Sequence, residues 1–209
     1  MSTSAPRLAP SVLDGFRGAA TSVISDNLAR LSAIVGLRPF HPSAKLVGSA
    51  LTVRVRAGDN LFVHQALGMI RPSDVLVVDG GGDVSRALVG EIMMTLARSR
   101  GAAGFVIDGA IRDVAAFEEA DFPCYARAAV PRGPSKNGPG QIDVPVSIGG
   151  WVVNPGDIVV GDRDGVVTFP PDAAPALLEA IRAQEAAEAE VLESIRTGRY
   201  DGRYARPSN

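Results

Sequence analysis

Four carboxylates and one arginine lie at the ends of apolar segments between residues 75 and 113, and these residue types could do chemistry together. They are Asp79, Glu91, Asp108, Arg112 and Asp113. Carboxylates can bind hard divalent cations or transfer protons, and an arginine, which is always charged, can stabilise a developing oxyanion. In an α/β arrangement, residues at the carboxyl ends of strands and at helix starts face a common crevice. We therefore expect these five side chains to share one site.

Two apolar runs, Val75–Val78 and Phe105–Ile107, predict buried strands with a helix between them. The helix is expected to begin after Gly90 and to end at Arg100-Gly101, a basic last turn followed by a glycine cap. The second strand is expected to break at Asp108-Gly109. Because neighbouring residues on a strand point to opposite faces, a bend there would allow the Arg-Asp pair that follows to reach one site.

The start of this helix is a candidate anion-binding site. Gly90 directly precedes the helix, so the backbone amides of Ile92 and Met93 are free at the helix N-terminus. Free amides and the positive end of the helix dipole bind anions. We therefore expect Gly90, Ile92 and Met93 to bind a carboxylate of the substrate.

The segments before this stretch predict helices and a strand. Two short helices are expected between Ser11 and Leu31, with Ser25-Asp26 as the cap of the second. Alternation of apolar and polar residues predicts a strand over 50–56 with one solvent-facing side. A helix capped by Asp59 is then expected over 60–69.

The segments after the central stretch have a different texture. Residues 131–140 hold three prolines and three glycines and predict a surface loop. Short apolar pieces separated by turns follow from residue 141 onward and predict a β-meander or small barrel. A long helix is expected over 173–196, with one apolar face that packs and several glutamates on its other faces.

Length and composition limit the class of protein. The 209 residues, 46% of them hydrophobic, fit one domain over 1–209. A net charge of −2 gives no broad attraction for nucleic acid or anionic lipid. The one cysteine, Cys124, excludes an intrachain disulfide and suits a reducing compartment. We see no secretory signal and no apolar run near the roughly 20 residues of a membrane span, so we expect a soluble cytoplasmic protein.

Several other residues have simpler interpretations than a site. The triple glycine at 80–82 lacks the Gly-Lys-Ser/Thr of a phosphate-binding loop. The segment Asp162–Gly165 lacks the distal glutamate of a calcium loop and predicts a plain turn. His41 and His64 have no second histidine at zinc-ligand spacing. Cys124, inside an expected strand, favours packing over nucleophilic chemistry.

Three motifs in this sequence support a resemblance to a known family. They are Gly104-x-x-x-Asp108-Gly109-x-x-Arg112-Asp113, Pro155-Gly156-Asp157 with Asp162-x-Asp164-Gly165-Val166, and Glu91 twenty residues before Arg112-Asp113. From about Phe16 to Gly198 the sequence resembles class II pyruvate aldolases acting on 4-hydroxy-4-methyl-2-oxoglutarate and 4-carboxy-4-hydroxy-2-oxoadipate. It is also similar to their relatives, the regulators of ribonuclease E activity A. Those aldolases have aspartate at the first position, where this chain has Glu91.

The resemblance implies an α/β fold, an α-β-β-α sandwich of the swivelling-domain kind, with a small β-meander portion and a long C-terminal helix. It implies a homotrimer or a dimer of trimers, in which helix 173–196 packs on a neighbouring subunit. It further implies Mg²⁺ or Mn²⁺ in an intersubunit cleft. The implied reaction is retro-aldol cleavage to pyruvate, with oxaloacetate decarboxylation as a second activity.

The chemistry of this reaction assigns roles to residues. Breaking a C–C bond beside a 2-oxo acid leaves an enolate, which a divalent cation and an arginine can stabilise. We expect Asp113 to bind the metal, Arg112 to stabilise the enolate, and Glu91 to order metal-bound waters and help form the base. The resemblance implies a further acid from the C-terminal helix of the adjacent subunit. Glu188 is our assignment for it, with Glu185 and Glu190 as rivals.

Two other functions are open at this point. The regulator branch of the resemblance implies a non-catalytic oligomer that binds a ribonuclease. The acid-x20-Arg-Asp spacing argues against that function, because a binding module has no need of those charges in one pocket. A dedicated oxaloacetate decarboxylase would use the same metal and arginine, since both reactions pass through pyruvate enolate.

Overall fold

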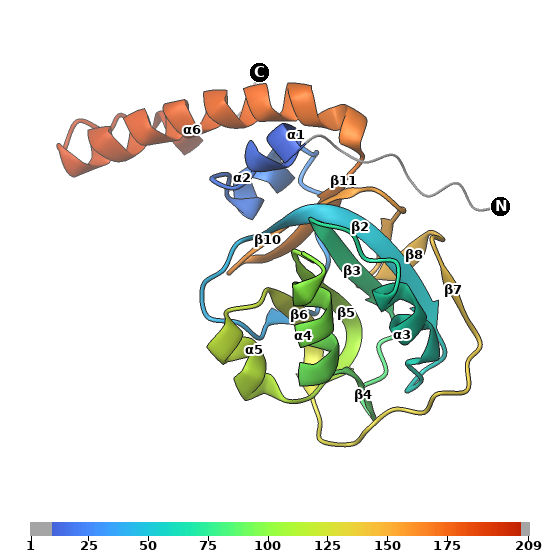
Figure 1. Cartoon of the computed structure of the whole chain (residues 1–209). Helices are drawn as coiled ribbons and strands as arrows, with labels where there is room; N and C mark the ends of the chain where they lie inside the picture. The colour runs from blue at the N-terminus through green and yellow to red at the C-terminus, as the bar shows by residue number, and fades with distance from the viewer. Residues whose placement is uncertain (1–9, 206–209) are drawn as a thin grey trace.

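A computed structural model of the chain describes residues 10–205. Its centre is a mixed sheet with the strand order β1-β6-β5-β3-β2-β10-β11 (Figure 1). Four neighbouring strands of this sheet are parallel: β2 (Leu46–Val55), β3 (Asp74–Asp79), β5 (Gly104–Ile111) and β6 (Cys124–Ala129). The helices that connect them are α3 (Leu61–Leu67), α4 (Glu91–Ser99) and α5 (Val114–Ala120).

Antiparallel strands complete the sheet on both sides. The hairpin of β10 (Ile158–Asp162) and β11 (Gly165–Phe169) pairs with β2, and β1 (Arg38–Pro39) pairs with β6. An isolated bridge between Ile34 and Val166 connects the segment before β1 to β11, so the sheet nearly closes into a barrel. The shorter strands are β4 (Ala87–Val89) on β5, β7 (Gly140–Ile142) on β2, and the separate pair β8 (Val146–Ile148) and β9 (Trp151–Val153).

Clusters of buried apolar side chains separate the layers of the molecule. One lies between α3, α4 and α5 and the outer face of the parallel strands, and it includes Leu76 and Val78. A second fills the inside of the curved sheet and includes Val75 and Val77. Because successive residues of β3 enter different clusters, both of its faces are buried, which explains its unbroken apolar run.

A third apolar cluster lies on the far side of the sheet. It packs α1 (Pro10–Asp14), α2 (Thr21–Asp26) and the start of α6 (Ala174–Arg196) against β10 and β11, around Phe16 and Phe169. Figure 1 shows these three helices together at one side, with α3, α4 and α5 across the strands from them. The order of layers is α-β-β-α, so the predicted sandwich is confirmed.

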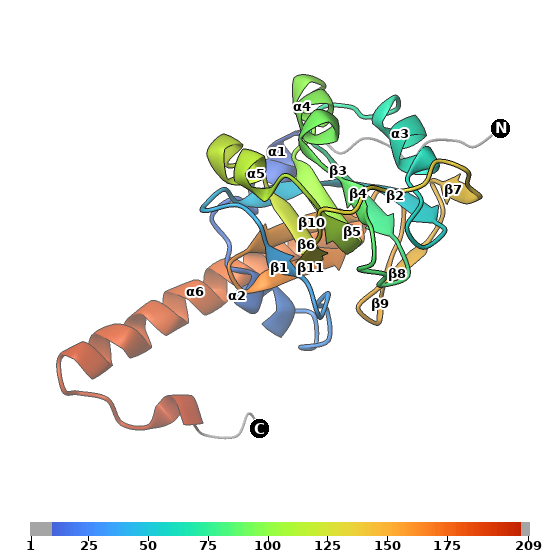
Figure 2. The ribbon, with the colours of Figure 1, turned by 90° about the horizontal axis from the view of Figure 1, so that it is seen from below.

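The long helix α6 confirms the predicted C-terminal helix. Leu177 and Ile181 in its first half are buried, whereas from Arg182 onward no side chain of the helix is buried. Figure 2 shows the second half extending away from the sheet. Its packing on a neighbouring subunit stays a prediction. Across residues 10–205, no helix has the length and apolar character that crossing a membrane would require.

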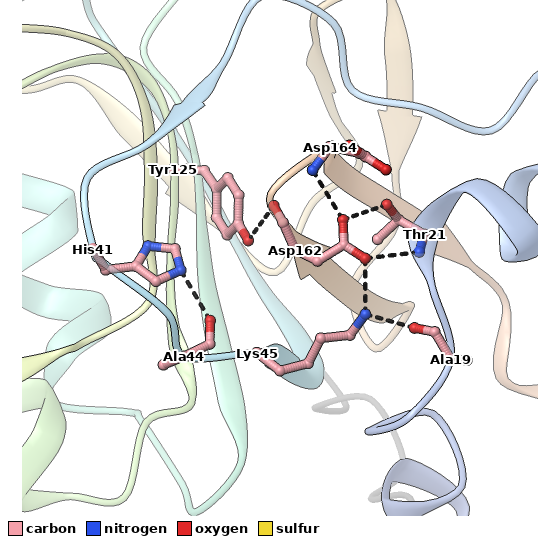
Figure 3. A network of polar contacts seen from close by, with 8 residues as sticks. All are labelled: Ala19, Thr21, His41, Ala44, Lys45, Tyr125, Asp162 and Asp164. Atoms are coloured by element: carbon pink, nitrogen blue, oxygen red, sulfur yellow. Dashed lines mark hydrogen bonds and ion pairs between the residues drawn. The ribbon is translucent and has the colours of Figure 1, made fainter.

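The turn between β10 and β11 is connected to the N-terminal helices through Asp162 (Figure 3). Its carboxylate accepts hydrogen bonds from the amide and hydroxyl of Thr21, at 2.8 and 2.6 Å, and from the Lys45 ammonium, at 2.9 Å. The amide of Asp164 donates to the same carboxylate at 3.0 Å. The hydroxyl of Tyr125 donates to the Asp162 carbonyl at 2.8 Å. The predicted turn is confirmed, and its aspartate caps the first residue of α2.

Two local predictions are wrong. Ser25-Asp26 does not cap the second helix, because α2 begins at Thr21 and these residues form its last turn. β5 does not break at Asp108-Gly109 but continues to Ile111, with an irregular register opposite β6. Pairing with β3, β4 and β6 holds this segment extended, and the turn comes later.

Candidate active site

The chain turns sharply at Arg112 and Asp113, between the end of β5 and the start of α5. Asp113 has a left-handed backbone, with φ of 59° and ψ of 41°, a conformation in which aspartate is enriched among non-glycine residues. The amide of Arg112 donates a 3.0 Å hydrogen bond to the carbonyl of Val89, which joins the turn to the end of β4. This turn takes the place of the predicted bend at Asp108-Gly109.

The start of α4 packs directly against this turn. The amide of Glu91 donates a 3.0 Å hydrogen bond to Oδ2 of Asp113, and Nε of Arg112 lies 3.6 Å from the same oxygen. A Cβ atom on Gly90 would lie 2.4 Å from that Oδ2, so only glycine permits this approach. In the described residues the amides of Ile92 and Met93 have no acceptor, so they are available to a ligand.

A cavity of about 180 Å³ opens at this helix start. From the α4 side it is lined by Gly90, Ile92, Met93, Arg112 and Asp113. From the α3 side and the loop at 131–140 it is lined by Asn60, His64 and Lys136. The cavity therefore joins the predicted carboxylate-binding amides, the arginine and the aspartate in one space.

The prediction that Asp79 and Asp108 share this site is wrong, because neither residue lines the cavity. They lie side by side in register at the ends of β3 and β5. Asp108 is buried, and its Oδ1 lies 2.5 Å from Nε of Arg127. Burial raises the pKa of Asp108, although Arg127 opposes that shift. The Glu91 side chain is exposed at the first turn of α4, beside the cavity rather than among its lining residues.

Asp113 has the chemistry of a ligand for a hard cation. Its side chain is 43% exposed, and Oδ1 has no protein partner among the described residues. No cluster of three or more His, Cys, Asp and Glu side chains in residues 10–205 could hold a metal ion. Mg²⁺ commonly uses one or two carboxylates and keeps several waters. A single carboxylate with a free oxygen is compatible with Mg²⁺ or Mn²⁺, which would take further ligands from water.

His41 and Cys124 are buried packing residues away from this cavity. Nδ1 of His41 accepts a hydrogen bond from the Cys124 amide at 3.1 Å, and Nε2 lies 2.9 Å from the carbonyl of Ala44 (Figure 3). Burial lowers the pKa of His41, although its contacts with the backbone of Cys124 and Ala44 oppose that shift. Burial also raises the pKa of the Cys124 thiol, which keeps it protonated and unreactive.

A family model described as RraA-like (Aldolase/RraA) matches residues 21–168. The chain belongs to the RraA-like family. The match includes the whole of the sheet from β1 to β10 and ends within β11, so the cavity lies inside it and α6 lies beyond it.

Individual relatives agree with this RraA-like assignment. The chain is 42% identical over 156 residues, 74% of each sequence, to a protein of Halalkalibacterium halodurans named "Putative 4-hydroxy-4-methyl-2-oxoglutarate aldolase". An uncharacterised protein from Pseudomonas syringae has a similar structure, with a TM-score of 0.84 and 28% identity over 94% of this chain and 95% of that one. The RNA-processing inhibitor RraA from Thermus thermophilis has a TM-score of 0.67 and 33% identity over 73% and 93%.

Glu188 lies in the second half of α6, which extends away from the sheet of this RraA-like chain (Figure 2), and it does not line the cavity. It is half-buried, and its Oε1 accepts a 2.8 Å hydrogen bond from Gln184. Glu185 is exposed, and Glu190 lies 3.8 Å from Arg203. The contribution of any of these glutamates to the cavity of an adjacent subunit stays a prediction.

Sequence reasoning did not identify Asn60 as a residue that lines the cavity, or Asp59 as the residue that binds the loop beside it. Asp59 and Asn60 stand directly before α3 and are 1% and 3% exposed. The available signal was a pair of polar residues at the start of a helix with an apolar face. That signal also fits an ordinary helix cap, and nothing in the spacing relates it to Arg112.

Proposed function

We propose that this RraA-like protein is a carbon–carbon lyase. It cleaves a 4-hydroxy-2-oxo diacid of the 4-hydroxy-4-methyl-2-oxoglutarate type into pyruvate and a second 2-oxo acid. The observation that carries the proposal is that Arg112, Asp113 and the unpaired amides of Ile92 and Met93 surround one cavity. The name of the Halalkalibacterium relative supports the substrate class.

The cavity offers a place for each polar group of the pyruvyl half. The amides of Ile92 and Met93 bind the 1-carboxylate at the N-terminus of α4, where the helix dipole favours an anion. Arg112 donates to the 2-oxo oxygen, on which negative charge develops. Asp113 would hold a divalent cation, Mg²⁺ or Mn²⁺, which would supply a Lewis acid for the negative charge that develops in the reaction.

Cleavage begins when the 4-hydroxyl loses its proton, a transfer that we assign to Glu91 acting through a water. The electron pair on that oxygen forms the C4 carbonyl of the second 2-oxo acid, and the C3–C4 bond breaks. Its electrons form the C2–C3 double bond of pyruvate enolate, whose oxygen Arg112 stabilises. A water molecule then protonates C3 to give pyruvate, and the proton that Glu91 took from the 4-hydroxyl returns to solvent. In a trimer or dimer of trimers, Glu188 of a neighbouring subunit is the second candidate for the proton transfer.

Oxaloacetate decarboxylation follows from the same arrangement. Loss of CO₂ from oxaloacetate leaves the same enolate oxygen next to Arg112, and no separate base is needed for the bond to break. We therefore expect it as a second activity of this site.

A non-catalytic role is the alternative from another class. The Thermus thermophilis relative is named as an RNA-processing inhibitor, so an oligomer of this chain that binds a ribonuclease is the competing function. That function would not require the close approach of Gly90 to Asp113 at the edge of the cavity.

A pyruvate-release assay tests the proposal. The purified protein is assayed with Mg²⁺ against 4-hydroxy-4-methyl-2-oxoglutarate, 4-carboxy-4-hydroxy-2-oxoadipate and oxaloacetate, with and without EDTA. We expect turnover that EDTA abolishes and that added Mg²⁺ or Mn²⁺ restores. No pyruvate from any substrate, together with tight binding to a ribonuclease, would overturn the lyase in favour of the regulator.

A further inference from the structure

One residue that lines the cavity has a buried hydrogen-bond acceptor without a partner. Asn60 is 3% exposed, and its Nδ2 donates to the Leu88 carbonyl at 2.9 Å and contacts Sδ of Met93 at 3.5 Å. Because a carbonyl can only accept, Leu88 fixes which end of the amide is nitrogen. Oδ1 of Asn60 has no hydrogen-bond partner, the one buried side-chain polar atom of residues 10–205 for which this holds. Such an atom typically costs about 1–3 kcal/mol, so a donor is expected there when the site is in use.

The loop that covers the α3 side of the cavity is held beside Asn60. The amide of Asn60 donates to the carbonyl of Ser135 at 3.0 Å. The carboxylate of Asp59 accepts hydrogen bonds from the hydroxyl of Ser135 at 2.9 Å and from the amide of Asn137 at 2.7 Å. Burial alone would raise the pKa of Asp59, but the hydrogen bonds from Asn137, Leu61 and Ser135 lower it to about 2. Asp59 is thus ionised at neutral pH and anchors the residues on both sides of Lys136.

Lys136 is therefore fixed at its backbone, while its side chain is exposed at the cavity. In the described part of the chain its ammonium forms no ion pair. His64, which also lines the cavity, has a pKa lowered by burial and by the charge of Lys136. A neutral histidine leaves Lys136 as the one cation on this side, since Arg112 lies on the α4 side.

We propose that Lys136 is the specificity-determining residue for the distal carboxylate of the substrate, with Asn60 as its positioning residue. The ammonium donates to Oδ1 of Asn60 and to the carboxylate together, so the unpaired acceptor is satisfied in the bound state. Asp59 holds the loop in the position that this requires. The inference rests on the proposed function for the pyruvyl half and adds which residues recognise the other half.

The size of the cavity agrees with such a ligand. At about 180 Å³ it is smaller than the roughly 300–1,000 Å³ of pockets for drug-sized ligands, and it suits a small acid with a charge at each end. Arg112 and the α4 amides take one end, and Lys136 takes the other. A lysine is a compact point charge with three donors, so it can serve the amide oxygen and a carboxylate at once.

Binding of two uncleavable acids separates this subsite from catalysis. 2-Oxoglutarate has a distal carboxylate, 2-oxopentanoate lacks it, and neither has the 4-hydroxyl that cleavage needs. By calorimetry with Mg²⁺, we expect the wild type to bind 2-oxoglutarate about tenfold more tightly, as a charged hydrogen bond would give. Lys136→Met should remove that preference while leaving 2-oxopentanoate affinity unchanged. Arg132→Met, which removes an exposed cation from the same loop outside the cavity, should keep it.

Asn60→Ala tests the positioning role. It should lower the preference for 2-oxoglutarate several-fold, whereas a merely structural role would weaken both acids equally. Three results would overturn the subsite. Lys136→Met could weaken the affinity for both acids equally, or it could keep the preference for 2-oxoglutarate. The wild type could also bind both acids with the same affinity.

Activity measurements distinguish failure of the subsite from failure of the proposed function. Exchange of the C3 protons of pyruvate in D₂O uses the pyruvyl half of the site alone, so Lys136→Met should leave its rate within about twofold. The same variant should lower kcat/KM for 4-hydroxy-4-methyl-2-oxoglutarate about tenfold, mainly through KM. Equal loss of exchange and cleavage would refute the assignment of Lys136. A wild type that shows the binding preference but neither exchange nor cleavage would refute the lyase and leave the subsite standing.

Discussion

The backbone amide of Glu91 donates a 3.0 Å hydrogen bond to Oδ2 of Asp113, so the first residue of α4 and the residue that precedes α5 are held together. The twenty residues between Glu91 and Arg112 form α4 and β5, which return the chain to this point. The bond uses the backbone of residue 91 and is therefore independent of whether its side chain is glutamate or aspartate. It also orients the carboxylate of Asp113 and leaves Oδ1 without a partner among the described residues.

Asp113→Asn should weaken metal affinity before it affects the fold. The amide side chain can still accept the hydrogen bond from Glu91 through its oxygen, but it loses the negative charge that attracts a hard cation. We expect at least a tenfold rise in the dissociation constant for Mn²⁺, measured by calorimetry, with the melting temperature of the metal-free protein within about 2 °C. Unchanged metal affinity would remove Asp113 as the ligand.

Gly90→Ala should impair catalysis without unfolding the protein. A Cβ atom there would lie 2.4 Å from Oδ2 of Asp113 and 3.0 Å from Cγ of Arg112. Both atoms belong to side chains that can move, so the cost to stability is small, but the two groups leave their positions. A displacement of about 1 Å can cost about 10²-fold in rate, and we expect a loss of that size in kcat/KM for cleavage.

The control for this change is Gly18→Ala, because a Cβ on Gly18 meets no atom within 4 Å. It should leave kcat/KM and the melting temperature unchanged. If Gly90→Ala kept full activity, the packing of α4 against the Arg-Asp turn would be irrelevant to the reaction.

Arg112→Ala should lower kcat by about 10²–10³-fold, since removal of a donor to a developing oxyanion typically has an effect of that size. Its side chain is 44% exposed, so the fold should not depend on it. Steady-state kinetics with oxaloacetate and with a 4-hydroxy-2-oxo diacid should show the same loss, because both reactions form pyruvate enolate. A fall of less than threefold in either reaction would contradict the assigned role.

The parts of the fold that sequence reasoning predicted correctly are those determined by local patterns. β3 and the first half of β5 are buried on both faces, so each produced an unbroken apolar run. α4 was predicted with its start after Gly90 and its end near Arg100, because a glycine and a basic last turn mark its ends. The end of β5 and the start of α4 determine where the Arg-Asp pair and the free amides beside it lie.

The parts that were missed depend on contacts between distant segments. Asp162 caps α2 although it lies 141 positions away in the sequence. The capping role was therefore wrongly assigned to Ser25-Asp26. Asp108 pairs with Arg127 on the next strand, which removes it from the predicted crevice. The bridge between Asp59 and Ser135 brings Lys136 to Asn60. No periodicity or spacing along the chain records these pairings.

Asp162→Asn should destabilise the protein, because the partly buried carboxylate accepts hydrogen bonds from Thr21, Lys45 and Asp164. An asparagine offers one acceptor atom and leaves Lys45 without a counter-charge. We expect a loss of about 2 kcal/mol, or roughly 4–8 °C in melting temperature. Asp14→Asn, which breaks the exposed pair with Arg17, should cost less than about 0.5 kcal/mol.

The acid limb of the stability curve gives an independent check on Asp162. Burial opposes ionisation, but the hydrogen bonds from Thr21, Lys45 and Asp164 outweigh it and lower the pKa of this carboxyl group. A group whose pKa is lowered by folding stabilises the native state fully above its unfolded pKa of about 3.9, and this contribution is lost as the pH falls through the lower folded-state value. Urea unfolding at a series of pH values should show a steeper loss below pH 4 for wild type than for Asp162→Asn. Parallel curves would mean that the charge of Asp162 does not hold α2 to the turn between β10 and β11.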